Sequence, residues 1–321
     1  MLLTRFSGFR FAVALMATSA GVACAQAYPN KPIRMVTSSA GATADFTARL
    51  IAQSLTGELG QQVVVDNRGG SVGTSVGIVA KAPPDGYTVL LYASSLWIAP
   101  LLQQVSYDPI KDFSPITLAA SSPYILVVHP TVPVTSVKEL IALAKAKPGE
   151  LNYGSSGLGT ANHLAAELFN AMAGVNIVHV PYKGAGPALN ALIGGQLQGM
   201  FPSAGSVTAH IKSGRLKALG VTSAEPSALV PGLPTVAASG VPGYESALMI
   251  GVFSPAGVPA ALINRLNQEI VKALRKSDIR ERLFNAGVEA VGGTPAQLAA
   301  SVKSEMARLN KVIKDAGIRA E

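Results

Sequence analysis

The sequence predicts an α/β protein made of two similar halves, and two observations support this prediction. Short strand-like runs alternate with helical patterns, which is typical of α/β folds with largely parallel sheets. A motif that begins at residue 38 also returns at residue 155, which indicates an internal repeat. The length of 321 residues suits two domains that each bury a core.

Residues 1–27 are predicted to form a secretory signal that is removed on export. Two arginines come first, residues 11–22 form a short apolar run, and Ala25-Gln26-Ala27 is a small-x-small cleavage site. We therefore expect cleavage after Ala27 and a periplasmic mature protein that begins at Tyr28. An alternative makes Cys24 a lipid acceptor, although the usual leucine three residues before the cysteine is missing.

Composition excludes several classes of protein. The chain has one cysteine and four histidines, which argues against iron–sulfur clusters, cysteine zinc sites and a disulfide scaffold. It has 26 basic and 18 acidic residues, but the basic residues are dispersed and lack interleaved aromatic residues, so no nucleic-acid partner is expected. Beyond the signal, no run of about 18 apolar residues predicts a membrane span. A mildly positive surface attracts small anions.

The elements of the first half follow one another closely. A strand at the start leads into a helix, an extended run, a helix rich in small residues and a second clear strand. Their expected ranges are 33–36, 44–55, 62–65, 73–80 and 87–92.

The second half shows clearer helix boundaries. Ser136-Val-Lys-Glu139 is a capping box that opens a helix to about residue 147, where Pro148-Gly149 ends it. Strands then alternate with helices, with expected ranges 151–153, 160–172, 176–180, 187–193, 198–201 and a helix to residue 212. Near the end, Pro259 suits the first position of a helix, and Thr294-Pro-Ala-Gln297 is a second capping box.

The repeat indicates what the two halves do together. Residues 38–48 read SSAGATADFTA and residues 155–165 read SSGLGTANHLA, which match at an offset of 155 − 38 = 117. Later, Ala93-Ser94-Ser95 is echoed by Pro202-Ser203-Ala204. Each loop joins a strand to a helix, and helix N-termini with Ser and Thr hydroxyls bind anions without a charged side chain. Two such loops that face each other would form a clam-shell binder.

Other chemistries have weaker support. Gly157-Leu-Gly159-Thr-Ala-Asn162 lacks the third glycine of a dinucleotide-binding loop, and His163 with Glu167 makes a poor metal site. No local signature aligns a catalytic serine with a histidine and an acid. We therefore expect no catalytic residues, no metal and no cofactor. Asp45 and Asn162 are expected to tie their loops rather than contact a ligand.

The sequence also resembles the solute receptors of tripartite tricarboxylate transporters, the Bug receptors, over nearly the whole mature chain. No single motif is specific, but their order and spacing together are. The motifs are YPNKPI at 28–33, Asp45 with Ala48-Arg49, DGYT at 85–88, YGSSG at 153–157, Gly159-Thr160, His163-Leu164, VPYKG at 180–184, Pro234-Thr235 and SPAG at 254–257.

This resemblance implies a two-lobed periplasmic-binding fold of type II, a Venus flytrap with its ligand cleft between the lobes. The first lobe would comprise residues 28–122 and 250–321, and the second residues 123–249. The expected ligand is a small carboxylate, the expected partners are the membrane permease subunits, and the expected state is a monomer. The ligand-binding residues, taken from the resemblance and the repeat, are Ser38, Ser39, Gly41, Ala42, Thr43, Ser94, Ser155, Ser156, Gly157, Thr160, His163, Tyr182 and Ser203.

Two departures from the family pattern bear on the ligand. Ser38 replaces the usual aromatic residue of the first loop, and Pro202-Ser203 replaces an acid that could pair with an ammonium group. These departures favour a di-, tri- or aromatic carboxylate over an amino acid. Two alternative functions stay open, namely a ligand-sensing subunit for a membrane sensor kinase and a periplasmic hydrolase that uses Ser155 or Ser156. The sequence leaves open the identity of the acid and the location of the permease genes.

Overall fold

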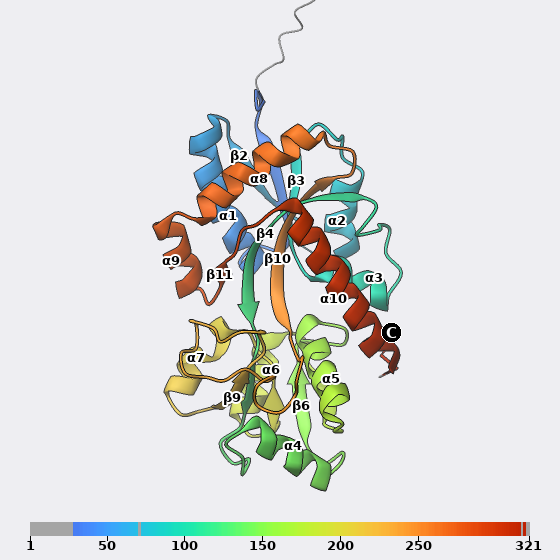
Figure 1. Cartoon of the computed structure of the whole chain (residues 1–321), viewed down its shortest axis with the longest axis vertical. Helices are drawn as coiled ribbons and strands as arrows, with labels where there is room; N and C mark the ends of the chain where they lie inside the picture. The colour runs from blue at the N-terminus through green and yellow to red at the C-terminus, as the bar shows by residue number, and fades with distance from the viewer. Residues whose placement is uncertain (1–27, 70–71, 316, 319–321) are drawn as a thin grey trace, which may run out of the picture.

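The computed structural model shows two lobes stacked end to end, each built on its own β-sheet (Figure 1). It describes residues 28–69, 72–315 and 317–318, so the predicted signal and Cys24 lie outside the described residues. Within these ranges no helix is both long and apolar enough to cross a bilayer. The two-lobed α/β prediction is confirmed.

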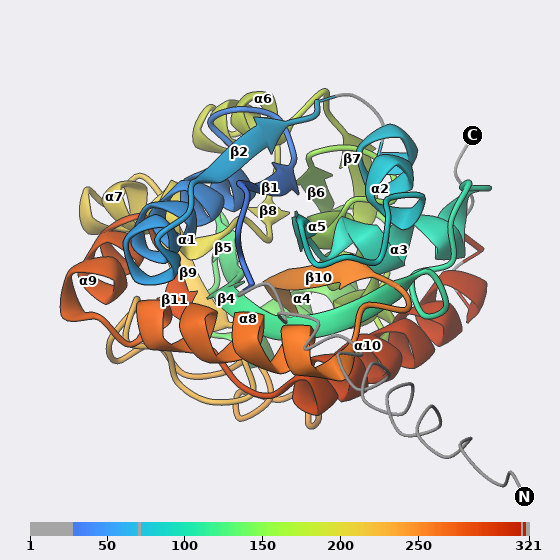
Figure 2. The ribbon, with the colours of Figure 1, turned by 90° about the horizontal axis from the view of Figure 1, so that it is seen from above.

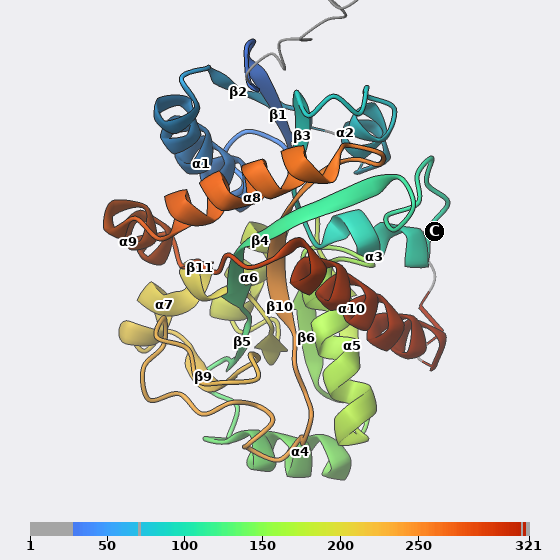
Figure 3. The same ribbon diagram turned by 45° about the horizontal axis from the view of Figure 1, so that its top comes forward.

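The first lobe surrounds a six-stranded sheet of order β11-β4-β10-β3-β1-β2. Its helices lie on both faces of the sheet, with α8 and α10 prominent in Figure 3. The elements are β1 (Ile33–Thr37), α1 (Thr43–Leu59), β2 (Val63–Asn67), α2 (Val72–Ala80), β3 (Thr88–Ala93), α3 (Ser95–Leu102), β4 (Phe113–Pro123), β10 (Ala247–Pro255), α8 (Ala260–Leu274), α9 (Ser277–Asn285), β11 (Glu289–Ala290) and α10 (Pro295–Asp315).

The second lobe surrounds a five-stranded sheet of order β7-β6-β8-β5-β9. All of its strands come from one continuous stretch of chain, residues 125–221. The elements are β5 (Ile125–Val128), α4 (Val137–Ala146), β6 (Asn152–Ser155), α5 (Ala161–Ala173), β7 (Val178–Pro181), α6 (Ala185–Ile193), β8 (Gly199–Met200), α7 (Ala204–Lys212) and β9 (Lys217–Val221).

The two sheets share one strand order. If β11 is set aside, β2-β1-β3-β10-β4 corresponds to β7-β6-β8-β5-β9. The internal repeat inferred from the loops therefore extends to the topology. The prediction of largely parallel sheets was wrong, because β10 runs antiparallel to β3 and β4, and β5 runs antiparallel to β8 and β9. The chain leaves the first sheet along β4 and returns along β10, so these two strands must point in opposite directions.

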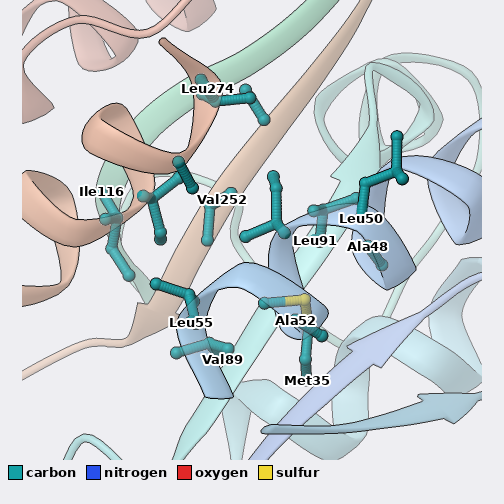
Figure 4. Packing of buried hydrophobic residues seen from close by; sticks show 14 of the residues in the cluster. Met35, Ala48, Leu50, Ala52, Leu55, Val89, Leu91, Ile116, Val252 and Leu274 are labelled. Carbon is teal, nitrogen blue, oxygen red and sulfur yellow. The ribbon is translucent and has the colours of Figure 1, made fainter. Parts of the chain in front are cut away.

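Alternating residues of the central strands supply two cores in the first lobe. Met35 and Leu91 pack with α1 and α8, whereas their neighbours Val36 and Tyr92 pack with α2, α3 and α10. Figure 4 shows Met35 and Leu91 beside residues of α1 and close to Val252 of β10. Since both faces are covered, β3 reads as a nearly continuous apolar run, with residues 89–92 all buried.

The helix boundaries follow the predicted capping signals with small differences. Ser136 accepts a hydrogen bond from the Glu139 amide, while the Glu139 carboxylate accepts one from the Thr135 amide. The second capping box is fully reciprocal, as Thr294 and Gln297 each accept from the other's amide. The placement of Pro259 as the first helical residue was wrong by one position, because α8 begins at the next residue and Pro259 is its N-cap.

A buried carboxyl group joins α10 to α3 in the first lobe. The indole Nε1 of Trp97 donates to Glu305 Oε2 at 2.5 Å, and Glu305 is only 5% exposed. Burial raises the pKa of Glu305 from 4.5 to about 7. Because the pKa is higher in the folded chain than in the unfolded chain, this group favours folding most below pH 4.5, and that contribution is lost as pH rises through about 7.

We expect Glu305→Gln to raise the free energy of unfolding at pH 8 by about 1–3 kcal/mol, because the amide keeps an acceptor for Trp97 and cannot ionise. At pH 4 the change should be below about 0.5 kcal/mol, since the carboxyl group is then neutral in both states. Urea unfolding at both pH values measures the difference. Glu281→Gln on the exposed face of α9 is the control, and an equal gain at both pH values would contradict the assignment.

Candidate functional site

The strand directions bring one end of each sheet to the boundary between the lobes. β4 runs from the first lobe towards β5, and Ala93 at the end of β3 lies opposite Ile250, which pairs with Ala120 late in β4. β1 and β2 run parallel to β3, so all three end towards the second lobe. In the second sheet β8 opposes β5, and β6 and β7 run with β8 towards the first lobe. The carboxyl ends of both sheets therefore face each other, which is where open α/β sheets bind ligands.

The first loop, residues 38–42, is fixed in place by the carboxylate of Asp45. Asp45 in the first turn of α1 accepts from the Gly41 amide at 2.8 Å and from Asn67 Nδ2 at 2.8 Å. Arg49 Nε lies 2.9 Å from Asp45 Oδ1. The net effect of these partners is a lowered pKa for Asp45, although its burial alone would raise it. Asp45 therefore stays ionised and positions the loop, as expected from the sequence.

The second loop, residues 156–160, is organised by an amide and an imidazole. Asn162 Oδ1 accepts from the hydroxyls of Ser156 and Thr160 at 2.8 and 2.7 Å. His163 Nδ1 accepts from the Gly159 amide at 3.0 Å. The expectation that Asn162 ties its loop is confirmed, and the loop is shaped without any ionised side chain in these contacts.

The backbone fixes the register of the two loops more accurately than the sequence does. Gly41 and Gly159 have φ values of 81° and 72°, and both donate their amide four residues ahead, to Asp45 and His163. The helix N-caps that follow share one backbone conformation. The structural offset is therefore 159 − 41 = 118, and the offset of 117 was wrong by one residue because matching serines outweighed the glycines.

The residues that follow the neighbouring strands β2 and β7 also correspond. The Arg68 amide donates to Thr37 O at 2.9 Å, and the Tyr182 amide donates to Ser155 O at 3.2 Å. Arg68 thus corresponds to Tyr182. The end of β1 corresponds to the end of β6, so Thr37 is the partner of Ser155.

Both helices present uncapped N-termini to this region. Ala42 and Thr160 are the N-caps of α1 and α5, and neither side chain accepts a hydrogen bond from a backbone amide of its helix, although the Thr160 hydroxyl donates to Asn162 Oδ1. Amides of the first turn are therefore available to an anion, and the helix dipoles favour negative charge at the same place. The predicted residues Thr43, Ser39 and Gly157 lie at or beside these N-termini.

A stack of three rings lies behind the second loop. The rings of His163 and His179 are 4.0 Å apart, and Tyr153 stacks on His179 at 5.0 Å. Burial lowers the pKa of His163 to about 3, with a further contribution from His179, and burial lowers the pKa of His179 to about 4. Both imidazoles are thus neutral at pH 7. Tyr153 donates to Glu167 Oε1 at 2.5 Å, and burial raises the pKa of Glu167.

Ser155 is paired with a histidine, as a hydrolase would require, but its surroundings differ from those of a nucleophile. Its Oγ lies 2.6 Å from His179 Nε2, accepts from the Gly157 amide at 3.1 Å, and the residue is 0% exposed. A catalytic hydroxyl needs access to substrate and a base near neutral pKa. The pair instead fixes the end of β6 beneath the loop, and the hydrolase alternative gains no support.

Two buried hydroxyls at the ends of neighbouring strands lack a partner. Among the described residues, Thr37 Oγ1 and Ser94 Oγ make no hydrogen bond although both residues are 0% exposed. Ser94 and Ser203 are the N-caps of α3 and α7, which confirms that their two segments correspond. Ser203 is partly exposed, and its hydroxyl contacts Ser206 at 3.3 Å.

Backbone and side-chain contacts hold the lobes in this arrangement. Leu164 of α5 is buried in the same cluster as Trp97 and other residues of the first lobe. Gly205 of α7 lies against the backbone of Gly287 so closely that a Cβ added at Gly205 would lie 2.6 Å from the Ala286 oxygen. Seen from above, α7 and α9 lie on the same side of the molecule (Figure 2).

Sequence reasoning missed Thr37 and His179 as parts of this region. Thr37 was placed outside the loop because the repeat was aligned one residue too late. His179 gave one usable signal, since it lies between two valines of its predicted strand, but its register opposite Tyr153 is visible only in the structure. In the part of the chain that the structure describes, no three His, Cys, Asp or Glu side chains are grouped as a metal site would require.

Comparison with known proteins identifies relatives across nearly the whole chain. Residues 47–318 match the tripartite tricarboxylate transporter family receptor. A UPF0065 protein in the tcbD-tcbE intergenic region of Pseudomonas sp. strain P51 is 39% identical over 313 residues, which cover 96% of this chain and 93% of the relative.

Two solved structures are similar over comparable lengths. Rpa4515 of R. palustris with adipate is 38% identical with a TM-score of 0.77, covering 91% of this chain and 99% of that chain. MatC from Rhodopseudomonas palustris with bound malate is 28% identical with a TM-score of 0.72, covering 89% of this chain and 100% of that chain. The fold described above is thus shared with proteins whose structures contain adipate or malate.

Proposed function

Because this chain belongs to the tripartite tricarboxylate transporter receptor family, we propose that it captures a small organic di-, tri- or aromatic carboxylate in the periplasm and delivers it to a membrane permease of that family. The observation that carries the proposal is the pair of equivalent loops at the facing ends of the two sheets. Each ends at an uncapped helix N-terminus. The adipate and malate of the related structures are diacids, and a diacid can place one carboxylate on each loop.

The roles of the individual residues are part of this proposal. The hydroxyls and amides of the two loops would hold the carboxylates, partly through ordered waters. Thr37 and Ser94 have hydroxyls that would gain partners from such waters, since buried polar groups are rarely left unpaired. Ser155 and His163 would act from beneath the second loop. The lobe boundaries near residues 122 and 249 and the monomeric state stay predictions.

Thermal unfolding of residues 28–321, stripped of bound ligand, tests the proposal. A panel of acetate, malate, adipate, citrate and benzoate at about 100 times Kd should yield about 2.7 kcal/mol of stabilisation for the acids that bind. Aspartate and glutamate, compared with succinate and glutarate, test the preference against an ammonium group. If the protein is folded and free of ligand, and no acid raises its unfolding temperature, carboxylate capture is refuted. Tighter binding of the amino acids would overturn only the preference.

A further inference from the structure

A large groove lies on the side of the second lobe, away from the two carboxylate loops. Its volume is about 750 Å³, within the range of sites for small organic ligands. α7, β9 and the chain from 228 to 233 line it, and Phe284 of α9 in the first lobe completes it. None of the loop residues 38–43 or 155–160 belongs to its lining. We call it the lateral groove.

The lateral groove has an apolar floor. Leu216, Leu219 and Leu229 line it and are 2–9% exposed, so the groove bottom is continuous with the core of the second lobe. Phe284 is 44% exposed although its neighbours Ile279 and Leu283 on α9 are buried. Phe284 extends the apolar lining of the groove beyond the leucines, and a contiguous exposed apolar surface of this kind is typical of a binding site.

The charges of the lateral groove are all of one sign. Within the part of the chain that the structure describes, the lining includes Lys212 and Lys217 but no Asp or Glu. Lys217 Nζ donates to Val132 O at 2.5 Å, so its ammonium group already has a hydrogen-bond partner. Lys212 is exposed and forms no ion pair with any described residue. One cation therefore stands at the edge of an apolar surface.

The groove also joins the lobes. Ser227, just before the lining chain, donates to Glu289 Oε1 of β11 at 2.6 Å. A ligand in the groove would therefore contact residues 228–233 of the second lobe and Phe284 of the first lobe, and the Ser227–Glu289 hydrogen bond joins the two lobes beside it.

We propose that the lateral groove is a second ligand site, for an amphipathic monoanion with a carboxylate or sulfonate head and an apolar body. The head pairs with Lys212, and the body covers the leucine floor and Phe284. A short diacid does not suit it, because its second charge would be buried against leucines without a partner. An added peptide strand could not pair along the whole outer edge of β9 either, because Val221 at its end already exchanges hydrogen bonds with Pro234 and Val236.

Calorimetric titration with dodecanoate, below its micelle concentration, tests the site on residues 28–321. Thr208→Glu on the groove face of α7 places a carboxylate one turn from Lys212, where it pairs with the lysine and repels the ligand. We expect affinity for dodecanoate to fall at least tenfold. Ala209→Glu adds the same charge to the next residue, which is exposed and outside the lining, and should change affinity less than twofold.

Two further variants test Lys212 and Phe284 separately. Lys212→Gln should weaken binding about two- to fivefold, as expected for an exposed ion pair. Phe284→Ala should weaken it about threefold or more, and acetate should not bind the groove. Unchanged thermal response to the diacid panel shows that each variant is folded. Equal affinity of Thr208→Glu and Ala209→Glu, or equal binding of dodecyltrimethylammonium, would overturn the proposal without affecting the carboxylate loops.

Discussion

His163→Asp should lower the affinity for the preferred diacid at least tenfold. The aspartate can accept from the Gly159 amide as Asp45 does from Gly41, so the loop keeps its shape. Its charge, however, has no counterpart of Arg49, because the residue four positions on is Glu167. An uncompensated carboxylate beneath the second loop opposes a ligand carboxylate roughly 6–11 Å away by about 1.5–3 kcal/mol at an effective dielectric constant of 20, and about 1.4 kcal/mol is a tenfold change in affinity.

His163→Asn is the matched variant for this test. Asparagine has the size of aspartate, keeps a neutral acceptor for Gly159, and removes the same ring from the stack with His179. We expect its diacid affinity to stay within about threefold of the parent, since it leaves the site's charge unchanged. Isothermal titration at pH 7 compares the two. Equal loss of affinity in both variants would assign His163 to packing alone.

Gly205→Ala should also lower diacid affinity at least tenfold. The change would alter the packing of the two lobes against each other and would leave the contacts within each loop unchanged. The new Cβ would lie 2.6 Å from the Ala286 oxygen and 3.2 Å from Gly287 Cα, and backbone atoms cannot move aside as a side-chain end can. The second lobe must shift away from the first, which separates the two loops. Isothermal titration measures the affinity, and small-angle scattering measures the change in the radius of gyration.

Gly186→Ala is the control for the lobe contact. Gly186 and Gly205 are each the second residue of a helix that begins with Ala-Gly, but the Cβ at 186 would meet no atom within 4 Å. Both changes favour helix formation by about 1 kcal/mol, so this effect cancels in the comparison. If the two variants bind the diacid equally, the Gly205–Gly287 contact does not govern the lobe arrangement.

The sequence predicted the elements that carry local signals and missed those that depend on distant pairing. Helices with caps, such as the one after Ser136, were placed to within a residue or two. The mixed sheet was not anticipated, because β10 pairs with β3 and β4 only after more than 120 residues of intervening chain. Strand direction across such a separation leaves no periodic signal in the sequence.

The site was predictable in kind but not in register. Serine, threonine and glycine between a strand and a helix predict a loop suited to an anion, and the structure places both such loops at the facing ends of the sheets, while ligand binding by them stays a prediction. The left-handed glycines at 41 and 159 set the true alignment, and glycine alone does not disclose its φ value. The pairing of His163 with His179 required knowledge that β6 and β7 are neighbours.

The position of β10 has a consequence for the order in which the chain folds. Every strand of the second sheet lies within residues 125–221, whereas the first sheet needs β10 at residues 247–255 to join β3 to β4. Pairing across a long loop forms slowly, because its closure entropy must be met before the contacts form. During synthesis or refolding, the sheet of the second lobe can therefore form from local contacts. The sheet of the first lobe stays incomplete until β10 has been added between β3 and β4.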